Sequence, residues 1–181
     1  MVYMFQEKTF IKSVPMCFPA NSLKGLPVGT FKIASKLNLE KGKKYKGCSY
    51  VDMMNKVLLT AINEGYIKSS YPLDHVGLGE ALAWFAFFDG NLRRSGKDGE
   101  YFNAFVSDDE LLETCVIDNE KEYHKKRSTC RPIRFVFVRH GDYSCHFEGI
   151  FYQESINIYK KGDVLIGETV LKRYNEWEQY I

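Results

Sequence analysis

The sequence has little that would hold the chain in a membrane or direct it out of the cell. Its longest apolar run, Ala81 to Phe88, is far shorter than the about 20 residues that cross a bilayer. Charged residues at positions 7, 8 and 12 interrupt the start of the chain before the apolar core of a signal peptide could form. The five cysteines are odd in number and include no CxxC pair, a pattern typical of reduced thiols inside a cell. We therefore expect a cytoplasmic protein with no membrane partner.

Motifs that hold cofactors or metals are also scarce. Gly77-Leu78-Gly79 lacks the third glycine of a dinucleotide fingerprint, and no Gly-Lys-Ser/Thr occurs for a phosphate loop. Cysteines and histidines do gather within 32 residues, at Cys115, His124, Cys130, His140, Cys145 and His146. Their spacing lacks the paired cysteines of a structural zinc site, and neighbours such as Cys145 and His146 point to opposite faces of a strand. We expect no metal and no cofactor.

What the chain has in quantity is aromatic and apolar side chains. Its 181 residues are 45% hydrophobic and 15% aromatic, with 13 Phe and 12 Tyr. This length suits a single domain over residues 1–181 with a substantial core. The aromatic excess favours strands and surfaces that use flat rings.

The net charge is only +2, but the charged residues are unevenly distributed. Residues 1–56 hold ten lysines and three acids, residues 74–122 hold twelve acids and four bases, and residues 123–146 hold six bases and one acid. Two basic blocks could meet in the fold and form an anion-binding face. They could equally neutralise the acidic block or face water.

The first half of the chain is expected to be extended over 1–47 and helical over 48–98. Ser49 to Gly65 is the clearest helix, since Ser49 and Asp52 stand at capping-box positions and Gly65 supplies a stop. We interpret Ala81 to Phe88 as a buried helix, with a buried strand over 84–88 as the alternative, because an all-apolar run has no period to decide between them.

The second half, residues 99–181, is expected to be rich in strands. The expected elements are a strand at 100–106, a short helix opening at Ser107 and ending at Thr114 or Cys115, a loop or frayed helix at 118–131, strands at 133–138 and 145–152, and two short strands around Lys161-Gly162-Asp163. This order indicates an α+β fold whose C-terminal half is a curved antiparallel sheet or a small open β-barrel.

The hairpin predicted at residues 133–152 is the best candidate site. The loop between its strands gathers residues that can contact phosphate, stack on a base or bond to its edge: Arg139, His140, Asp142, Tyr143 and Ser144. Gly149, in the middle of the second strand, indicates a bulge or a close contact with the backbone. The competing interpretation is an ordinary polar turn.

The pattern of strands in residues 99–171 is similar to that of PUA-like modules, the superfamily that includes the SET-and-RING-associated domains attached to restriction enzymes. The segments that carry the resemblance are "GEYFNAFV", "RPIRFVFVR" and "HFEGIFY". The glycine-rich signatures of the eukaryotic members are absent. The resemblance implies nucleic-acid binding, with a modified DNA base as one candidate target, in a restriction-modification or antiviral defence system.

If the resemblance holds, a basic face would grip phosphates and a ring such as Tyr143 or Tyr152 would stack on a flipped base. The residues assigned to nucleic-acid binding are Lys125, Lys126, Arg127, Arg131, Arg134, Arg139, His140, Asp142, Tyr143 and Tyr152, with Lys43, Lys44 and Lys46 as further candidates for the basic face.

Two other classes of function stay open. A small metal-dependent nuclease or hydrolase could use His140, Asp142, His146 and Glu148, although no nuclease motif or nucleophile elbow is present and a non-catalytic role is favoured. A protein-interaction subunit of a phage or defence system, with a protein partner or a second copy of the chain, would explain the aromatic excess and the uneven charge.

Overall fold

The computed structural model describes residues 8–15, 37, 39–95 and 99–174, and these form two compact units. The unit that we call the hairpin unit contains residues 37, 39–87, 131–152 and 173–174. The α4 unit contains 8–15, 88–95, 99–130 and 153–172. Strand β9 passes from one unit to the other after Tyr152. None of the described helices is long and apolar enough to cross a membrane.

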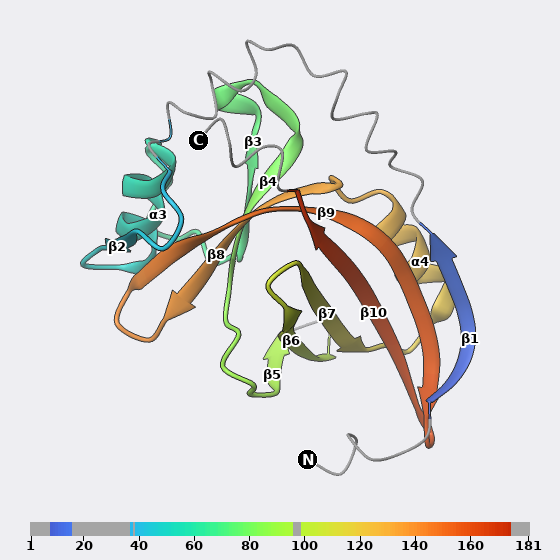
Figure 1. Ribbon diagram of the computed structural model, residues 1–181. Helices are drawn as coiled ribbons and strands as arrows, with labels where there is room; N and C mark the ends of the chain where they lie inside the picture. Colours follow the sequence, from blue (N-terminus) through green and yellow to red (C-terminus); the bar gives the residue numbers. More distant parts are fainter. Residues whose placement is uncertain (1–7, 16–36, 38, 96–98, 175–181) are drawn as a thin grey trace. The chain divides into compact units, whose positions relative to one another are not determined.

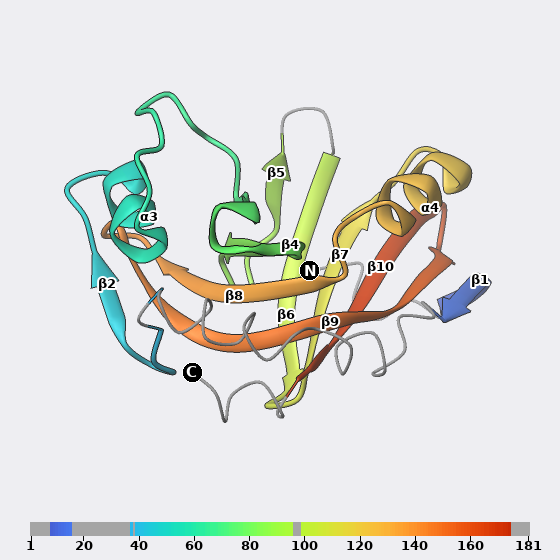
Figure 2. The ribbon, with the colours of Figure 1, turned by 90° about the horizontal axis from the view of Figure 1, so that it is seen from above.

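The hairpin unit is a sheet with one helix on it (Figures 1 and 2). Its elements are β2 (Lys44–Lys46), α3 (Tyr50–Leu58), β3 (Ser70–Leu73), the 3₁₀ helix η3 (Asp74–Val76), β4 (Leu78–Ala86), β8 (Ile133–His140) and the first half of β9 (Ser144–Lys161). The strand order is β3-β4-β8-β9, and β2 pairs with the start of β9. The β4–β8 pair is parallel, whereas β3–β4, β8–β9 and β2–β9 are antiparallel.

Helix α3 begins as the sequence predicted but ends earlier. The Ser49 side chain accepts a hydrogen bond from the Asp52 backbone N–H, which satisfies one free donor of the first turn. The helix ends at Leu58 because Leu59 takes a left-handed conformation, with φ of 53°. The predicted stop at Gly65 was therefore wrong. The apolar face of α3 packs on the core with Phe85, among other residues of the sheet.

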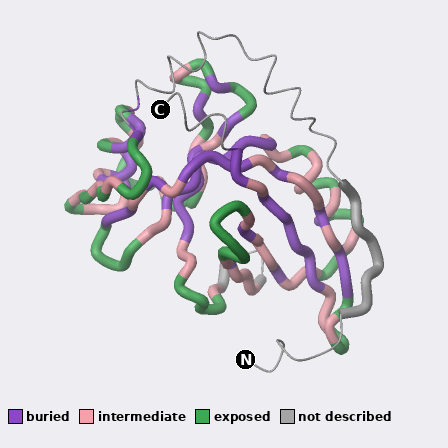
Figure 3. Tube along the Cα trace, viewed as in Figure 1, coloured by how far each residue is buried: buried purple, intermediate pink, exposed green. Residues whose placement is uncertain are grey.

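Residues 81–86 lie in strand β4 (Leu78–Ala86), so the predicted helix was wrong and the alternative strand is confirmed in part. The β4 residues pair with β8 residue by residue from Ala81 to Ala86. Alanine and aromatic side chains at 81, 83, 84, 85 and 86 are all buried, as Figure 3 shows for this strand. A parallel strand covered on both faces carries a continuous apolar run, which removes the alternation that marks a half-exposed strand.

Strand β9 changes its phase at a bulge, which confirms the prediction made from Gly149. The pairing with β8 shifts between Val136 and Phe137, so that Glu148 is an extra residue in β9. Gly149 has φ of 145°, a conformation that a side chain would strain. Before the bulge Cys145 and Phe147 face the core, and after it Ile150 does. The bulge thus moves the core-facing positions from odd to even numbers.

The α4 unit is an antiparallel sheet with helix α4 packed on it. Its elements are β1 (Lys8–Pro15), β5 (Arg93–Ser95), β6 (Gly99–Ser107), β7 (Glu110–Val116), α4 (Glu120–Ser128), the second half of β9 and β10 (Val164–Arg173). The strand order is β9-β10-β7-β6-β5, with β1 on β9. Tyr123 of α4 lies against Gly167 of β10, where a β-carbon would come within 2.5 Å of the tyrosine ring.

The structure settles three predictions for the second half of the chain. The helix predicted from Ser107 was wrong, because residues 110–116 form β7 and Ser107 instead accepts a hydrogen bond from the Asp109 N–H in the turn before it. The helical alternative for 118–131 is confirmed by α4. The strands predicted at 133–138 and 145–152 are confirmed, and of the two short strands predicted around residues 161–163 the second is confirmed as β10, whereas the first is the continuation of β9 rather than a separate strand.

The fold is therefore mixed and made mostly of strands, in agreement with the predicted α+β class. Residues 48–98, predicted to be helical, hold α3 and η3 but also β3, β4 and β5. The strand predicted from "TFKIAS" lies outside the described residues. The curved sheet or small barrel stays a prediction.

Candidate nucleic-acid interface

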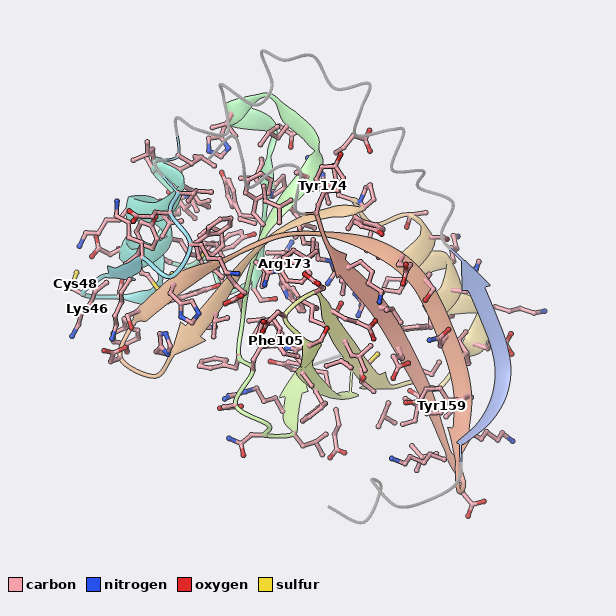
Figure 4. The ribbon with its side chains drawn as sticks, in the orientation of Figure 1. Lys46, Cys48, Phe105, Tyr159, Arg173 and Tyr174 are labelled. Atoms are coloured by element: carbon pink, nitrogen blue, oxygen red, sulfur yellow. The ribbon has the colours of Figure 1, made fainter. Side chains whose placement is uncertain are left out.

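The candidate interface is one face of the hairpin unit, where β2 lies beside the β8–β9 hairpin. Lys44 is opposite His146 and Lys46 is opposite Ser144 across β2 and β9, while His140 is opposite Ser144 across β8 and β9. Directly opposite residues of an antiparallel pair share a face. We call this the lysine–histidine face, and its residues are Lys41, Lys44, Lys46, His140, His146 and Glu148. Figure 4 shows Lys46 at this end of the sheet.

The tip of the hairpin presents an exposed tyrosine in an unusual backbone conformation. The loop has three residues, 141–143, and Tyr143 has φ of 54°. A three-residue hairpin loop places a left-handed residue at its third position, where glycine fits best. Tyrosine there costs about 1 kcal/mol, and its side chain is nevertheless 53% exposed. Tyr143 therefore combines a left-handed backbone with an exposed position at the tip of the hairpin.

Asp142 in the same loop organises two of the lysines. Its carboxylate lies 3.6 Å from the Lys44 Nζ and 3.7 Å from the Lys46 Nζ, and it accepts a hydrogen bond of 2.5 Å from the Ser144 hydroxyl. The bond from Ser144, and then the charges of Lys44 and Lys46, hold the pKa of Asp142 below its ordinary value. Asp142 therefore stays charged and lies near both lysines.

Beside the lysines, two histidines form a chain of hydrogen bonds with a carboxylate. The His140 Nε2 lies 3.0 Å from the His146 Nδ1, and the His146 Nε2 lies 3.4 Å from the Glu148 Oε2. Glu148 also accepts a bond of 2.7 Å from Arg173, which is itself buried and lies over the Phe151 ring. Partial burial lowers the pKa of His140 most, and the charges of His146 and Lys44 lower it further. The charge of Asp142 acts in the opposite direction.

The opposite face of the hairpin packs inward. The Arg139 guanidinium lies 4.0 Å from the centre of the Tyr50 ring and 4.4 Å from that of Phe87. Burial raises the pKa of Tyr50 to about 12 although the charge of Arg139 acts against the rise. Burial also raises the pKa of the Cys145 thiol to about 12. Arg139 is thus separated from His140, its neighbour in the predicted site, by the alternation of the strand.

Other predicted site residues of the hairpin unit lie in its body. Arg131 pairs with Asp74 at 2.7 Å, and Arg134 is buried with its guanidinium 4.7 Å from the centre of the Trp84 ring. Tyr152 is partly buried against the core and meets Tyr174 edge to face. Lys43 lies over the Tyr45 ring.

The remaining predicted residues lie in the α4 unit. Lys125 and Lys126 are exposed on α4. Arg127 pairs with Glu113 at 2.9 Å, and the two side chains are only 12% and 15% exposed. The ten residues assigned to one site from the sequence are therefore divided between two units, and their role in nucleic-acid binding stays a prediction.

Sequence reasoning missed Lys41 and Arg173 and did not recognise the histidine chain as a unit. The His140-x₅-His146 spacing across a short hairpin loop was a usable signal for two rings that meet. Arg173 gave no such signal, since it lies 25 residues from Glu148.

Neither metal ligands among the described residues nor similarity to known proteins indicates a function for this face. Among the described residues, no three His, Cys, Asp or Glu side chains come together as a group that could hold a metal ion. No protein-family model, no curated protein and no solved structure matches this chain. Function is therefore inferred from the face itself.

Proposed function

We propose that the hairpin unit binds a strand of nucleic acid through the lysine–histidine face. The observation that carries the proposal is the pairing of β2 with β9, which sets Lys44 and Lys46 beside the hairpin tip, far from their place in the sequence. Lys41 lies at the histidine chain, with its Nζ 3.9 Å from Glu148. Three ammonium groups on one face match the spaced charges of a phosphate backbone.

The ion pairs on this face would not prevent phosphate from binding. Lys44 and Lys46 are 58% and 67% exposed in their side chains, and Asp142 is 48% exposed. Exposed pairs of this kind contribute little to stability because water screens them. A phosphate can thus replace Asp142 as the partner of the two lysines, which already lie near the same carboxylate.

Tyr143 would supply the contact with a base. It is exposed in the same three-residue loop as Asp142, the partner of Lys44 and Lys46, and its ring can stack on an unpaired base of any sequence. Such a contact is worth about 1–3 kcal/mol per base. A preference for a modified base, and a place in a defence or restriction system, would follow if the tip also discriminates the edge of that base.

The salt dependence of binding tests the proposal. Three phosphate contacts give a slope of log K against log salt of about −2.1 to −2.7, so affinity should fall about 20–40-fold between 50 and 200 mM salt. Fluorescence anisotropy with labelled single-stranded and duplex DNA and RNA measures this slope. A Lys44→Ala, Lys46→Ala double variant should reduce the slope by about 1.4–1.8.

A Lys125→Ala, Lys126→Ala double variant is the matched control, because it removes the same charge from the exposed surface of α4. If the control lowers affinity as much as the β2 variant does, the lysine–histidine face is not the interface. Absence of salt-dependent binding at 50 mM salt would contradict the proposal as a whole.

A second candidate function is binding of a protein partner or a second copy of the chain. The segment after α3 exposes Leu59 and Ile67, which are 65% and 89% accessible. Single exposed apolar side chains are common, but a contiguous patch of them marks an interaction site, and these two residues are where such a patch would lie. Mass measurement by light scattering, with a Leu59→Ser, Ile67→Ser variant as comparison, tests self-association: a monomer at every concentration would exclude the second copy.

A further inference from the structure

The histidine chain has only one arrangement of protons when both rings are neutral. Glu148 can only accept, so the proton of His146 lies on Nε2 and its Nδ1 accepts. The His140 Nε2 must then donate to that Nδ1. The lone pair of the His140 Nδ1 is left at the end of the chain, on a side chain that is itself exposed. This is the order of groups that orients a general base.

The charges around the two rings favour an anion over a cation as their ligand. Lys41, Lys44 and Lys46 are ammonium groups of the same face. Asp142 and Glu148 are the carboxylates that these lysines meet, and Arg173 also pairs with Glu148. A metal ion would be repelled by the excess of positive charge, whereas a phosphodiester would be attracted.

We propose that the lysine–histidine face cleaves RNA without a metal ion, with the His140 Nδ1 as the general base. The inference depends on the proposed function, because the lysines must first hold the strand. RNA carries its own nucleophile, the 2′-hydroxyl next to each phosphate, so no metal-bound water is needed.

The reaction is a transfer within the strand. The His140 Nδ1 takes the proton of the 2′-hydroxyl, the 2′-oxygen forms a bond to phosphorus, and the bond from phosphorus to the 5′-oxygen breaks. The leaving 5′-oxygen takes a proton from the Lys44 ammonium. Solvent then removes the proton from His140 and returns one to Lys44. The products are a 2′,3′-cyclic phosphate and a 5′-hydroxyl, with no net gain or loss of protons.

The other members of the chain act through His140. His146 accepts the His140 Nε2–H and so shares the positive charge that forms on the ring, and Glu148 stabilises that charge from the far side. Partial burial, then the charges of His146 and Lys44, lower the pKa of His140, which favours the neutral ring that a general base needs. We therefore call His146 and Glu148 positioning residues.

The test uses the full chain in EDTA with a 5′-labelled single-stranded RNA of mixed sequence. We expect fragments that end in a 2′,3′-cyclic phosphate, identified by mass. His140→Ala should reduce the rate about 10²–10⁴-fold. Glu148→Gln should reduce the rate less and should move the acid limb of the pH–rate profile to lower pH, because the positively charged ring loses a stabilising carboxylate. His124→Gln, on α4, is the matched control and should cleave like the wild type.

A 2′-O-methyl RNA of the same sequence separates this inference from the proposed function, because it can bind but cannot react. Salt-dependent binding of that strand without cleavage of the unmodified RNA overturns the inference and leaves the proposed function standing. Absence of binding to either strand overturns both. Cleavage that requires a divalent cation, that leaves 3′-hydroxyl ends, or that survives in His140→Ala overturns the proposed chemistry.

Discussion

Replacing Glu113 by glutamine should destabilise the α4 unit strongly, because Arg127 would keep its charge in a buried position without its partner. The Arg127 Nη1 lies 2.9 Å from the Glu113 carboxylate, and both side chains are more than four-fifths buried. The nearby carboxylate raises the pKa of Arg127 against the effect of burial, so the guanidinium cannot escape by losing its proton.

The size of the effect follows from the burial of the pair. Breaking a buried ion pair by removing one partner costs about 3–5 kcal/mol. For a chain of this length each kcal/mol lowers Tm by about 2–4 °C, so the expected fall is about 6–20 °C. Replacing both residues, as in Arg127→Met with Glu113→Leu, should recover most of the loss because no lone charge stays buried.

Differential scanning calorimetry measures the shift, and Asp142→Asn is the control. Asp142→Asn loses the charge of the exposed pairs with Lys44 and Lys46 but keeps an oxygen that can accept from the Ser144 hydroxyl, so the Tm should change little. A Glu113→Gln variant as stable as the wild type would refute the reasoning. Arg127 would then again be a candidate for nucleic-acid binding.

Three further outcomes follow from local geometry. Gly167→Ala should destabilise the α4 unit by about 1–3 kcal/mol, measured by urea unfolding, because the new methyl group meets the Tyr123 ring. Hydrogen bonds from Lys56 and Cys48 hold the pKa of Asp52 at about 2 instead of 3.8, so its stabilising effect is complete above about pH 4 and is lost as pH falls toward 2. The difference in Tm between wild type and Asp52→Asn should therefore shrink over that range, and a constant difference would contradict the assignment. Iodoacetamide at pH 8 should label the exposed Cys48 well before the buried Cys145, as peptide mass mapping would show, and equal rates would contradict the burial.

Local patterns in the sequence predicted what local physics decides. The Ser49 cap and the strands of the β8–β9 hairpin were found because capping residues and alternation act over a few positions. The run at 81–86 was misassigned because its partner strand β8 lies 52 residues further along the chain, with Ala81 paired to Ile133, and so leaves no local signal. The helix predicted from Ser107 was wrong for a related reason. The serine hydroxyl accepts a hydrogen bond from a nearby N–H in a turn as readily as at the start of a helix.

The candidate site was predicted in part. The hairpin tip was located correctly, since residues 141–143 form its turn. The neighbours that give the tip its chemistry come from elsewhere, with Lys44 on β2 and Arg173 at the end of β10. Only the folded chain shows that these segments meet, and strand alternation then separates Arg139 from His140.

The extra residue in β9 has a consequence for tracing this chain through evolution. Glu148 exists in the ladder only because the strand has one residue more than its partner β8 at that point. A descendant that deletes this residue would have regular pairing between β8 and β9 and would lose the carboxylate that orients His146. In an alignment of distant relatives, a single gap at 148 should therefore accompany substitution of the two histidines, while sequences that keep the full length should keep all three side chains together.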